Sequence, residues 1–435
     1  MREPGESLGG GDGRRRGRGA QREKQVQETL PGDNPKHFCI VPDMRILDWC
    51  VLAFVVYEAI LLASSQYPAN GASAFEAVAV AALTYFSLRA LVHTTKLASW
   101  LCGLVAIAGI WLGTSGIREF ANGIEPLSAV GLTNFVAFRS RLIHPILGWV
   151  PGETFTVFLL FLPFACAAAV YNWHRRNYPI ATLALVAATF VVAVLTLSLS
   201  RAVFWSTGLF FLITCALLVG YRAVTLRTGS LVIAGALGSM LLIMACEAAL
   251  YPGIFTAYAG RHTSQIRSTQ GRIGIWERSL EIVRQHPWCG VGSSNAALFL
   301  LSTSDQDETI GFASKAFSLP IQVLVEKGVI GCGLYVSFLI LIGYEFHRSM
   351  RSQRVTGTSA SSPTCAKIRG SAKRNQKELS RHNEVAHKAM KCCYAAGLLA
   401  VLFREITYSS LLEHTATLTL AYMLAALGCG EVRAS

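Results

Sequence analysis

The feature that most constrains this chain is a series of ten apolar runs, most of them long enough to cross a bilayer. A helix needs about 20 apolar residues to cross ~30 Å of hydrocarbon. Only 15% of the 435 residues are charged, against about 25% in soluble domains, which excludes a water-soluble fold. We therefore predict an all-α, polytopic bundle of about ten transmembrane helices. The runs lie near 46–65, 72–92, 97–114, 154–172, 179–199, 203–221, 230–251, 317–344, 390–404 and 411–430.

Polar segments between the runs suggest how the chain is organised. Two are basic and low in complexity and predict disorder, and one is long enough to hold an amphipathic helix. The predicted parts are a disordered basic cytoplasmic tail (1–44), helices one to seven (45–251), an extracytoplasmic loop with an amphipathic helix (252–316), helix eight (317–344), a disordered basic cytoplasmic loop (345–389) and helices nine and ten (390–435).

The distribution of positive charge predicts the orientation. With both termini in the cytoplasm, 27 of the 39 Lys and Arg residues fall in cytoplasmic segments, as the positive-inside rule requires. The net charge of +13 is then explained without nucleic acid as a partner.

The arginines of the predicted outer loop oppose this bias and need another explanation. A planar guanidinium can give two parallel hydrogen bonds to phosphate oxygens, so these side chains could hold a lipid diphosphate at headgroup level. Pairing with Glu277 and Glu281, or contact with phospholipid headgroups, would also account for them. The five are Arg261, Arg267, Arg272, Arg278 and Arg284.

Four residues predict one apolar face of a helix in this loop. Ile273, Trp276, Leu280 and Val283 recur at spacings of three and four. The sequence His286-Pro287 predicts its end. Such a helix would lie on the outer membrane interface with Trp276 at headgroup depth.

A further arginine follows an apolar run at the outer end of the predicted fifth span. Arg201 comes after Leu-Ser-Leu-Ser. A cation at that depth is costly and favours an anionic partner or a water-filled cavity, although a side chain reaching back to the headgroups is the other explanation.

Taken in order, these pieces resemble the O-antigen ligase and polymerase superfamily of polytopic glycosyltransferases. Its members share a Ser-Arg at the outer end of a middle helix and an outer loop with Arg, Trp and a His-Pro-x-x-Gly-x-Gly turn. A helix with Gln-x-x-x-Glu-x-Gly-x-x-Gly follows. The matching residues are Ser200-Arg201, Arg272, Trp276, His286-Pro287, Gly290, Gly292, Gln322, Glu326, Gly328 and Gly331.

The resemblance implies transfer of a glycan from an undecaprenyl-diphosphate carrier to an acceptor saccharide or lipid A-core. The reaction would take place on the outer face of the inner (cytoplasmic) membrane, without metal, cofactor or nucleotide sugar. Arg201 and Arg272 would clamp the diphosphate. The residues expected to contact substrate are Arg267, Trp276, Arg278, Gly290, Gly292 and Gln322.

One position departs from the ligase pattern. Ligases of the family usually carry a His, the presumed general base, five residues before the motif Gln, and here that position is Phe317. Glu326 is next to Lys327, where an ion pair would explain both charges. The possible substitute bases are His262, His286, Asp305, Asp307 and Glu326.

Two other functions stay open from the sequence. A polytopic transporter or flippase is the first, although such proteins tend to show paired repeats and broken helices, and the sequence shows no matching halves. An inactive scaffold of a polysaccharide assembly system is the second. Release of undecaprenyl diphosphate by the purified protein would distinguish an enzyme from both.

Overall fold

The computed structural model describes most of the chain, and the statements below concern the described residues. The helices named below belong to one unit, Arg45–Ser435, and Met1–Met44 form another. The predicted basic tail lies almost entirely outside the described part. The described residues are 44–92, 94–130, 151–197, 201–250, 262–302, 318–352, 370–405 and 415–429.

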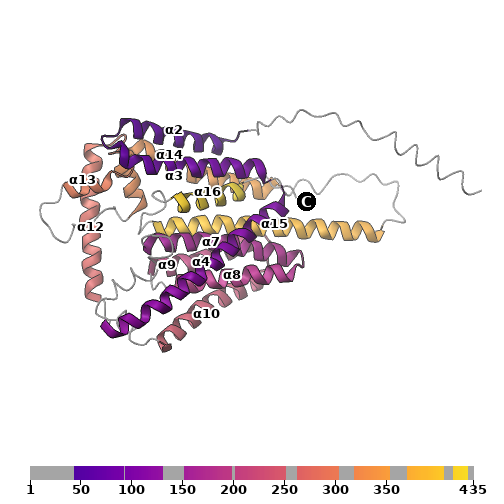
Figure 1. Ribbon diagram of the computed structural model, residues 1–435. Helices are drawn as coiled ribbons and strands as arrows, with labels where there is room; N and C mark the ends of the chain where they lie inside the picture. The colour runs from indigo at the N-terminus through magenta and orange to yellow at the C-terminus, as the bar shows by residue number, and fades with distance from the viewer. Residues whose placement is uncertain are drawn as a thin grey trace, which may run out of the picture. The chain divides into compact units, whose positions relative to one another are not determined.

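Each of the ten predicted spans corresponds to a helix (Figure 1), which confirms the predicted all-α polytopic class. Eight of these helices are long and apolar enough to cross a membrane, whereas the apolar stretches of α10 and α16 are shorter. The ten are α2 (Ile46–Ser64), α3 (Pro68–Leu91), α4 (Thr95–Val130), α7 (Pro151–His174), α8 (Tyr178–Leu197), α9 (Arg201–Gly220), α10 (Leu226–Leu250), α14 (Leu319–Ser352), α15 (Gly370–Glu405) and α16 (Thr415–Cys429).

Large apolar side chains cover outward faces of these helices. Trp49, Leu83, Trp111, Trp205 and Ile340 are each between 60% and 69% exposed. Soluble proteins rarely leave so much apolar surface uncovered, and lipid tails are the environment that suits it. The chain is a multi-pass membrane protein.

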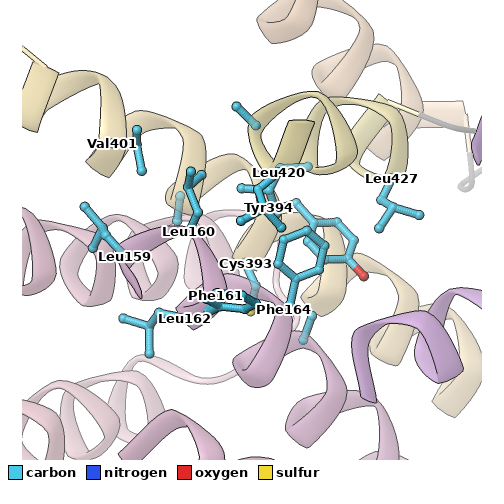
Figure 2. Packing of buried hydrophobic residues seen from close by; sticks show 14 of the residues in the cluster. Leu159, Leu160, Phe161, Leu162, Phe164, Cys393, Tyr394, Val401, Leu420 and Leu427 are labelled. Atoms are coloured by element: carbon cyan, nitrogen blue, oxygen red, sulfur yellow. The ribbon is translucent and has the colours of Figure 1, made fainter. Parts of the chain in front are cut away.

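The centre of the bundle is α7, which is buried on every side. Residues 157–162 are all buried, as expected of a helix that is apolar all round. Figure 2 shows Phe164 of α7 beside Tyr394 of α15, with their ring centroids 6.1 Å apart. Leu420 and Leu427 of α16 belong to the same cluster. These three helices form a packed core to which the others attach.

The loop predicted to be disordered between 345 and 389 is largely helical. Helix α14 continues to Ser352 and α15 already begins at Gly370. The charges taken as a sign of disorder include Glu384 and Lys388, which form an ion pair one helical turn apart. Such spacing stabilises a helix. The residues between the two helices lie outside the described part.

The C-terminal part of α14 lies at one end of the bundle, and its contacts show which way the neighbouring helices run. The ammonium of Lys391, just past the middle of α15, donates a hydrogen bond to the Ser349 hydroxyl. The ring of Tyr221, directly after α9, lies 5.9 Å from the ring of Phe346. Helix α9 therefore runs parallel to α14 and starts, at Arg201, at the other end. Helix α15 runs antiparallel to α14.

That other end is crossed by α12 (His262–Gln285), which runs over the ends of the membrane helices rather than beside them (Figure 1). The short helix α13 (Ala296–Ser302) follows it. Between the two helices, Asn295 donates a 2.8 Å hydrogen bond to Ser65, directly after α2. We call the end of the bundle that α12 crosses the α12 end, and the end at which α14 terminates the opposite end.

We predict that the α12 end faces away from the cytoplasm. Cys289 lies at this end and is exposed, so an impermeant thiol reagent is expected to label it in intact spheroplasts. Cys365, in the predicted cytoplasmic loop, is expected to react only after permeabilisation. A Cys289→Ser variant supplies the control, since its labelling should disappear. Labelling of Cys365 but not Cys289 in intact spheroplasts would reverse the orientation.

Candidate functional site

Helix α14 is broken at Gly328, where the backbone has φ 62° and ψ −165°. The sequence predicted one continuous span over 317–344, and the break at Gly328 shows that this prediction was wrong. The long arm, Val329–Ser352, measures about 36 Å at 1.5 Å per residue and crosses a bilayer alone. The short arm, Leu319–Lys327, is therefore not needed for crossing and packs against α12 instead.

A break at this depth leaves carbonyl groups without helical partners. On the short arm these are Val325 and Glu326. The amide of Val291 donates to the carbonyl of Val325 and the amide of Gly292 to that of Glu326, both at 2.9 Å. The turn after α12, which we call the capping turn (residues 286–295), thus satisfies the end of the short arm.

The same turn satisfies the beginning of the long arm. The amide of Val329 donates to the carbonyl of Pro287 at 2.8 Å, and the amide of Ile330 donates to that of Trp288 at 3.3 Å. Both sides of the break are therefore capped by one segment. The two motifs of the resemblance, far apart in sequence, form a single backbone joint.

Glycine is required in this joint because the two backbones approach closely. A Cβ atom on Gly328 would lie 2.3 Å from the carbonyl oxygen of Trp288, and one on Gly290 would lie 2.4 Å from that of Val325. Gly290 also has a positive φ of 65°, which side chains disfavour. Gly290 and Gly292, expected to contact substrate, have a structural task here.

A buried ion pair holds the joint to α2. The Lys327 ammonium contacts the Glu58 carboxylate, and the two residues are 2% and 1% exposed. The Ser293 hydroxyl donates to Glu58 at 2.6 Å and accepts from Lys327 at 2.7 Å. The Tyr57 hydroxyl donates to the carbonyl of Lys327 at 2.6 Å. The pair joins α2, the capping turn and the short arm.

This partner of Lys327 differs from the expected one. The sequence suggested Glu326, but adjacent residues on a helix point in different directions. Glu326 instead accepts a 2.5 Å hydrogen bond from the side-chain amide of Gln322, one turn earlier on the short arm. Gln322 and Glu326 are 3% and 5% exposed. The motif's Gln and Glu therefore form a buried unit of their own.

Helix α12 packs on the joint through Ile275 and Ile282, which contact Val291 of the capping turn and Val325 of the short arm. Of the predicted apolar face, Val283 is partly buried against the same cluster, whereas Ile273 and Leu280 are each 46% exposed. The exposed part of that face stays a predicted contact with the membrane interface.

Arg278 lies on α12 between Ile275 and Ile282, on the packed side at helical spacing. Its Nη1 atom is buried and has no hydrogen-bond partner among the described residues. Burying a guanidinium nitrogen without a partner is unfavourable. In contrast, Arg284 is 78% exposed and pairs with Glu281 at 3.1 Å, as the simpler explanation of the loop arginines proposed.

The other predicted site residues are placed as follows. Arg272 and Trp276 are half-buried on α12, and both make contacts with other groups. His286, after α12, has its ring 5.7 Å from that of Phe299. Arg201 is the first residue of α9, so its backbone lies at the α12 end. The positions whose side chains lie outside the described part are Arg201, Arg261, His262, Arg267, Asp305, Asp307 and Phe317.

Two charged residues at the α12 end were missed from sequence. Arg404 and Glu405, the last residues of α15, are 3% and 0% exposed. The Glu405 carboxylate accepts a 2.6 Å hydrogen bond from the Arg404 guanidinium and a 3.3 Å hydrogen bond from the Thr156 hydroxyl. The sequence signal that could have revealed them is a pair of charged residues at the end of an apolar run, where charges are costly and often functional.

These features define a class: a polytopic helical membrane protein in which an arginine-bearing crossing helix is joined to a broken membrane helix. Residues 183–336 match the protein-family model for O-antigen ligase, and this segment includes α9, α12 and the break in α14. The match confirms the resemblance to the O-antigen ligase and polymerase superfamily. It supports a glycosyltransferase of ligase or polymerase type, with the bilayer and lipid-linked glycans as partners. The search of curated proteins found no match.

We predict that the Glu58–Lys327 pair is essential for the stability of the joint. Glu58→Gln or Lys327→Met alone is expected to lower the free energy of unfolding by about 3–5 kcal/mol, because each leaves a buried charge without its counter-charge. The double variant should lose less than the sum. Denaturant unfolding of the purified protein in detergent measures this.

The exposed pair Glu281–Arg284 supplies the control. Removing either partner is expected to change the unfolding free energy by less than about 1 kcal/mol. Single variants of Glu58 and Lys327 as stable as this control would show that the joint does not depend on the buried pair.

Proposed function

We propose that this protein transfers a glycan from an undecaprenyl-diphosphate carrier to an acceptor saccharide or lipid A-core. In this proposal the reaction occurs at the α12 end, on the outer face of the inner membrane, with both termini in the cytoplasm. The observation that carries the proposal is the buried Nη1 atom of Arg278, which has no hydrogen-bond partner among the described residues. It suits an anionic ligand at the joint between α12 and α14.

A diphosphate is the ligand that this chemistry favours. Guanidinium groups bind phosphate oxygens through two parallel hydrogen bonds. Arg272 and Arg278 lie on α12, and Arg201 begins α9 at the same end of the bundle. When the anomeric C–O bond breaks, negative charge grows on the departing diphosphate. Fixed cations would stabilise that charge, the task that a metal ion performs in other transferases.

The arginines of α12 provide a test with a control on the same helix. Arg278→Ala or Arg272→Ala is expected to reduce release of undecaprenyl diphosphate at least about a hundredfold, as removal of one transition-state donor typically does. Lys replacements should restore activity only in part, because an ammonium lacks the planar fork. Arg284→Ala, on the exposed side, should retain activity. Equal activity of all the Ala variants would leave the arginines with no role in transfer.

We propose Glu326 as the group that activates the acceptor. Its carboxylate would take the proton of the acceptor hydroxyl while that oxygen forms a bond to the anomeric carbon. The bond from this carbon to the diphosphate oxygen breaks, and undecaprenyl diphosphate leaves. Gln322 supports this role because its amide donates to Glu326 at 2.5 Å, and a bound amide fixes the carboxylate's orientation.

Substitution of this carboxylate tests the assignment. Glu326→Gln is expected to lower the transfer rate by about 10²–10⁴-fold, the usual contribution of a general base. Glu277→Gln removes an exposed carboxylate of α12 and should leave the rate unchanged. An active Glu326→Gln variant would place the base elsewhere, with His286 the next described candidate.

The break in α14 also favours a second function, that of a transporter. Broken membrane helices often form substrate sites in transporters. Here, however, the backbone groups freed at Gly328 are capped by the protein's own turn. Purified protein that releases undecaprenyl diphosphate is an enzyme, whereas movement of the lipid-linked glycan across vesicle membranes without release would identify a flippase.

A further inference from the structure

An apolar groove lies between α14 and α15, toward the opposite end of the bundle from α12. Its volume is about 420 Å³, within the ~300–1,000 Å³ of ligand pockets. One wall is a stripe of α14 that runs from Tyr335 through Ile342 to His347. The twelve steps of 1.5 Å from Tyr335 to His347 make this stripe about 18 Å long. The groove is long, narrow and suited to a chain.

The facing wall is a stripe of α15, and α16 and α2 contribute the floor. Ala395, Leu398 and Leu402 come from α15, and Leu418 comes from α16. Leu399, at the rim, is 48% exposed, so the groove opens outward among apolar side chains. A segment at bilayer depth that opens in this way is accessible to lipid tails.

The same stripe of α15 carries polar side chains beyond the end of the groove. Lys391 lies one helical turn before Ala395, and His387 lies two turns before it. Lys391 is 1% exposed and donates to Ser349 across the groove end. His387 is 4% exposed, and its Nε2 atom has no hydrogen-bond partner among the described residues. A buried polar nitrogen therefore lies at this end and lacks a described partner.

The other side of this end also carries cationic and polar groups. The Tyr221 hydroxyl and the His347 Nδ1 atom are 3.1 Å apart. Arg351 follows His347 by four residues on α14, so it lies one turn further along the same side of this helix. The groove thus ends among Lys391, Arg351 and two imidazoles.

We propose that this groove binds one anionic phospholipid, with an acyl chain between α14 and α15 and its phosphate among the basic groups at the opposite end. Basic pockets between membrane helices bind anionic headgroups in this manner. The polyprenyl donor fits less well, because the arginines proposed for its diphosphate lie at the α12 end. This site is therefore separate from the proposed transfer site.

Two glycines of α14 allow the groove to be filled with a matched control. Gly343 lines the groove, and a Cβ atom on it would meet nothing within 4 Å. Gly333 is equally open but does not line the groove. At neither position does the added Cβ atom meet an obstacle, and leucine favours helix over glycine.

The test is native mass spectrometry of the full chain, purified in mild detergent and titrated with phosphatidylglycerol or phosphatidylcholine. We expect one retained phosphatidylglycerol, bound about tenfold or more tightly than phosphatidylcholine. Gly343→Leu should lose this lipid, and Gly333→Leu should keep it. Arg351→Gln should reduce the preference for the anionic headgroup more than Arg348→Gln does, because Arg348 already pairs with Glu345.

Three results would overturn the proposal. One is equal lipid retention by Gly343→Leu and Gly333→Leu. Another is equal binding of the two headgroups, and the third is a polyprenyl diphosphate as the retained lipid. Arg351 is exposed, so its variant tests the headgroup site even if Gly343→Leu does not fold.

Discussion

The structure depends on how the break at Gly328 is capped. Backbone groups freed within a membrane helix must find partners, because hydrocarbon offers none. The capping turn supplies two amides to the short arm and two carbonyls to the long arm. This exchange fixes the turn after α12 to both arms of α14.

The Glu58–Lys327 pair adds a third element to this joint. Two buried charges are costly to desolvate, and Ser293 offsets part of that cost by bonding both. Since Ser293 belongs to the capping turn, the turn cannot shift without disturbing the pair. Arg278 on α12 and Glu326 on the short arm are consequently held in a fixed relation, which is what a transfer reaction between a bound donor and a bound acceptor requires.

The two ends of the bundle differ in chemistry. At the α12 end, buried charges are arranged around a broken helix, with arginines on a crossing helix above it. At the opposite end, an apolar groove reaches Ala395 and His347, and Lys391 and Arg351 follow one helical turn beyond them. The first end suits a lipid diphosphate and its glycan, and the second suits the headgroup of an ordinary membrane lipid. The packed core around α7 separates them.

The sequence by itself determined the ten apolar helices, because apolar length is a local property, and eight of them are long enough to cross a membrane. Only the tertiary structure decided which residues meet. Lys327 finds Glu58, 269 positions away, rather than its neighbour, because adjacent helical side chains diverge. Likewise, only packing shows that Ile275 and Ile282 are the residues of α12 that lie buried against the joint. Local patterns specify helices, whereas partners across the bundle follow from packing.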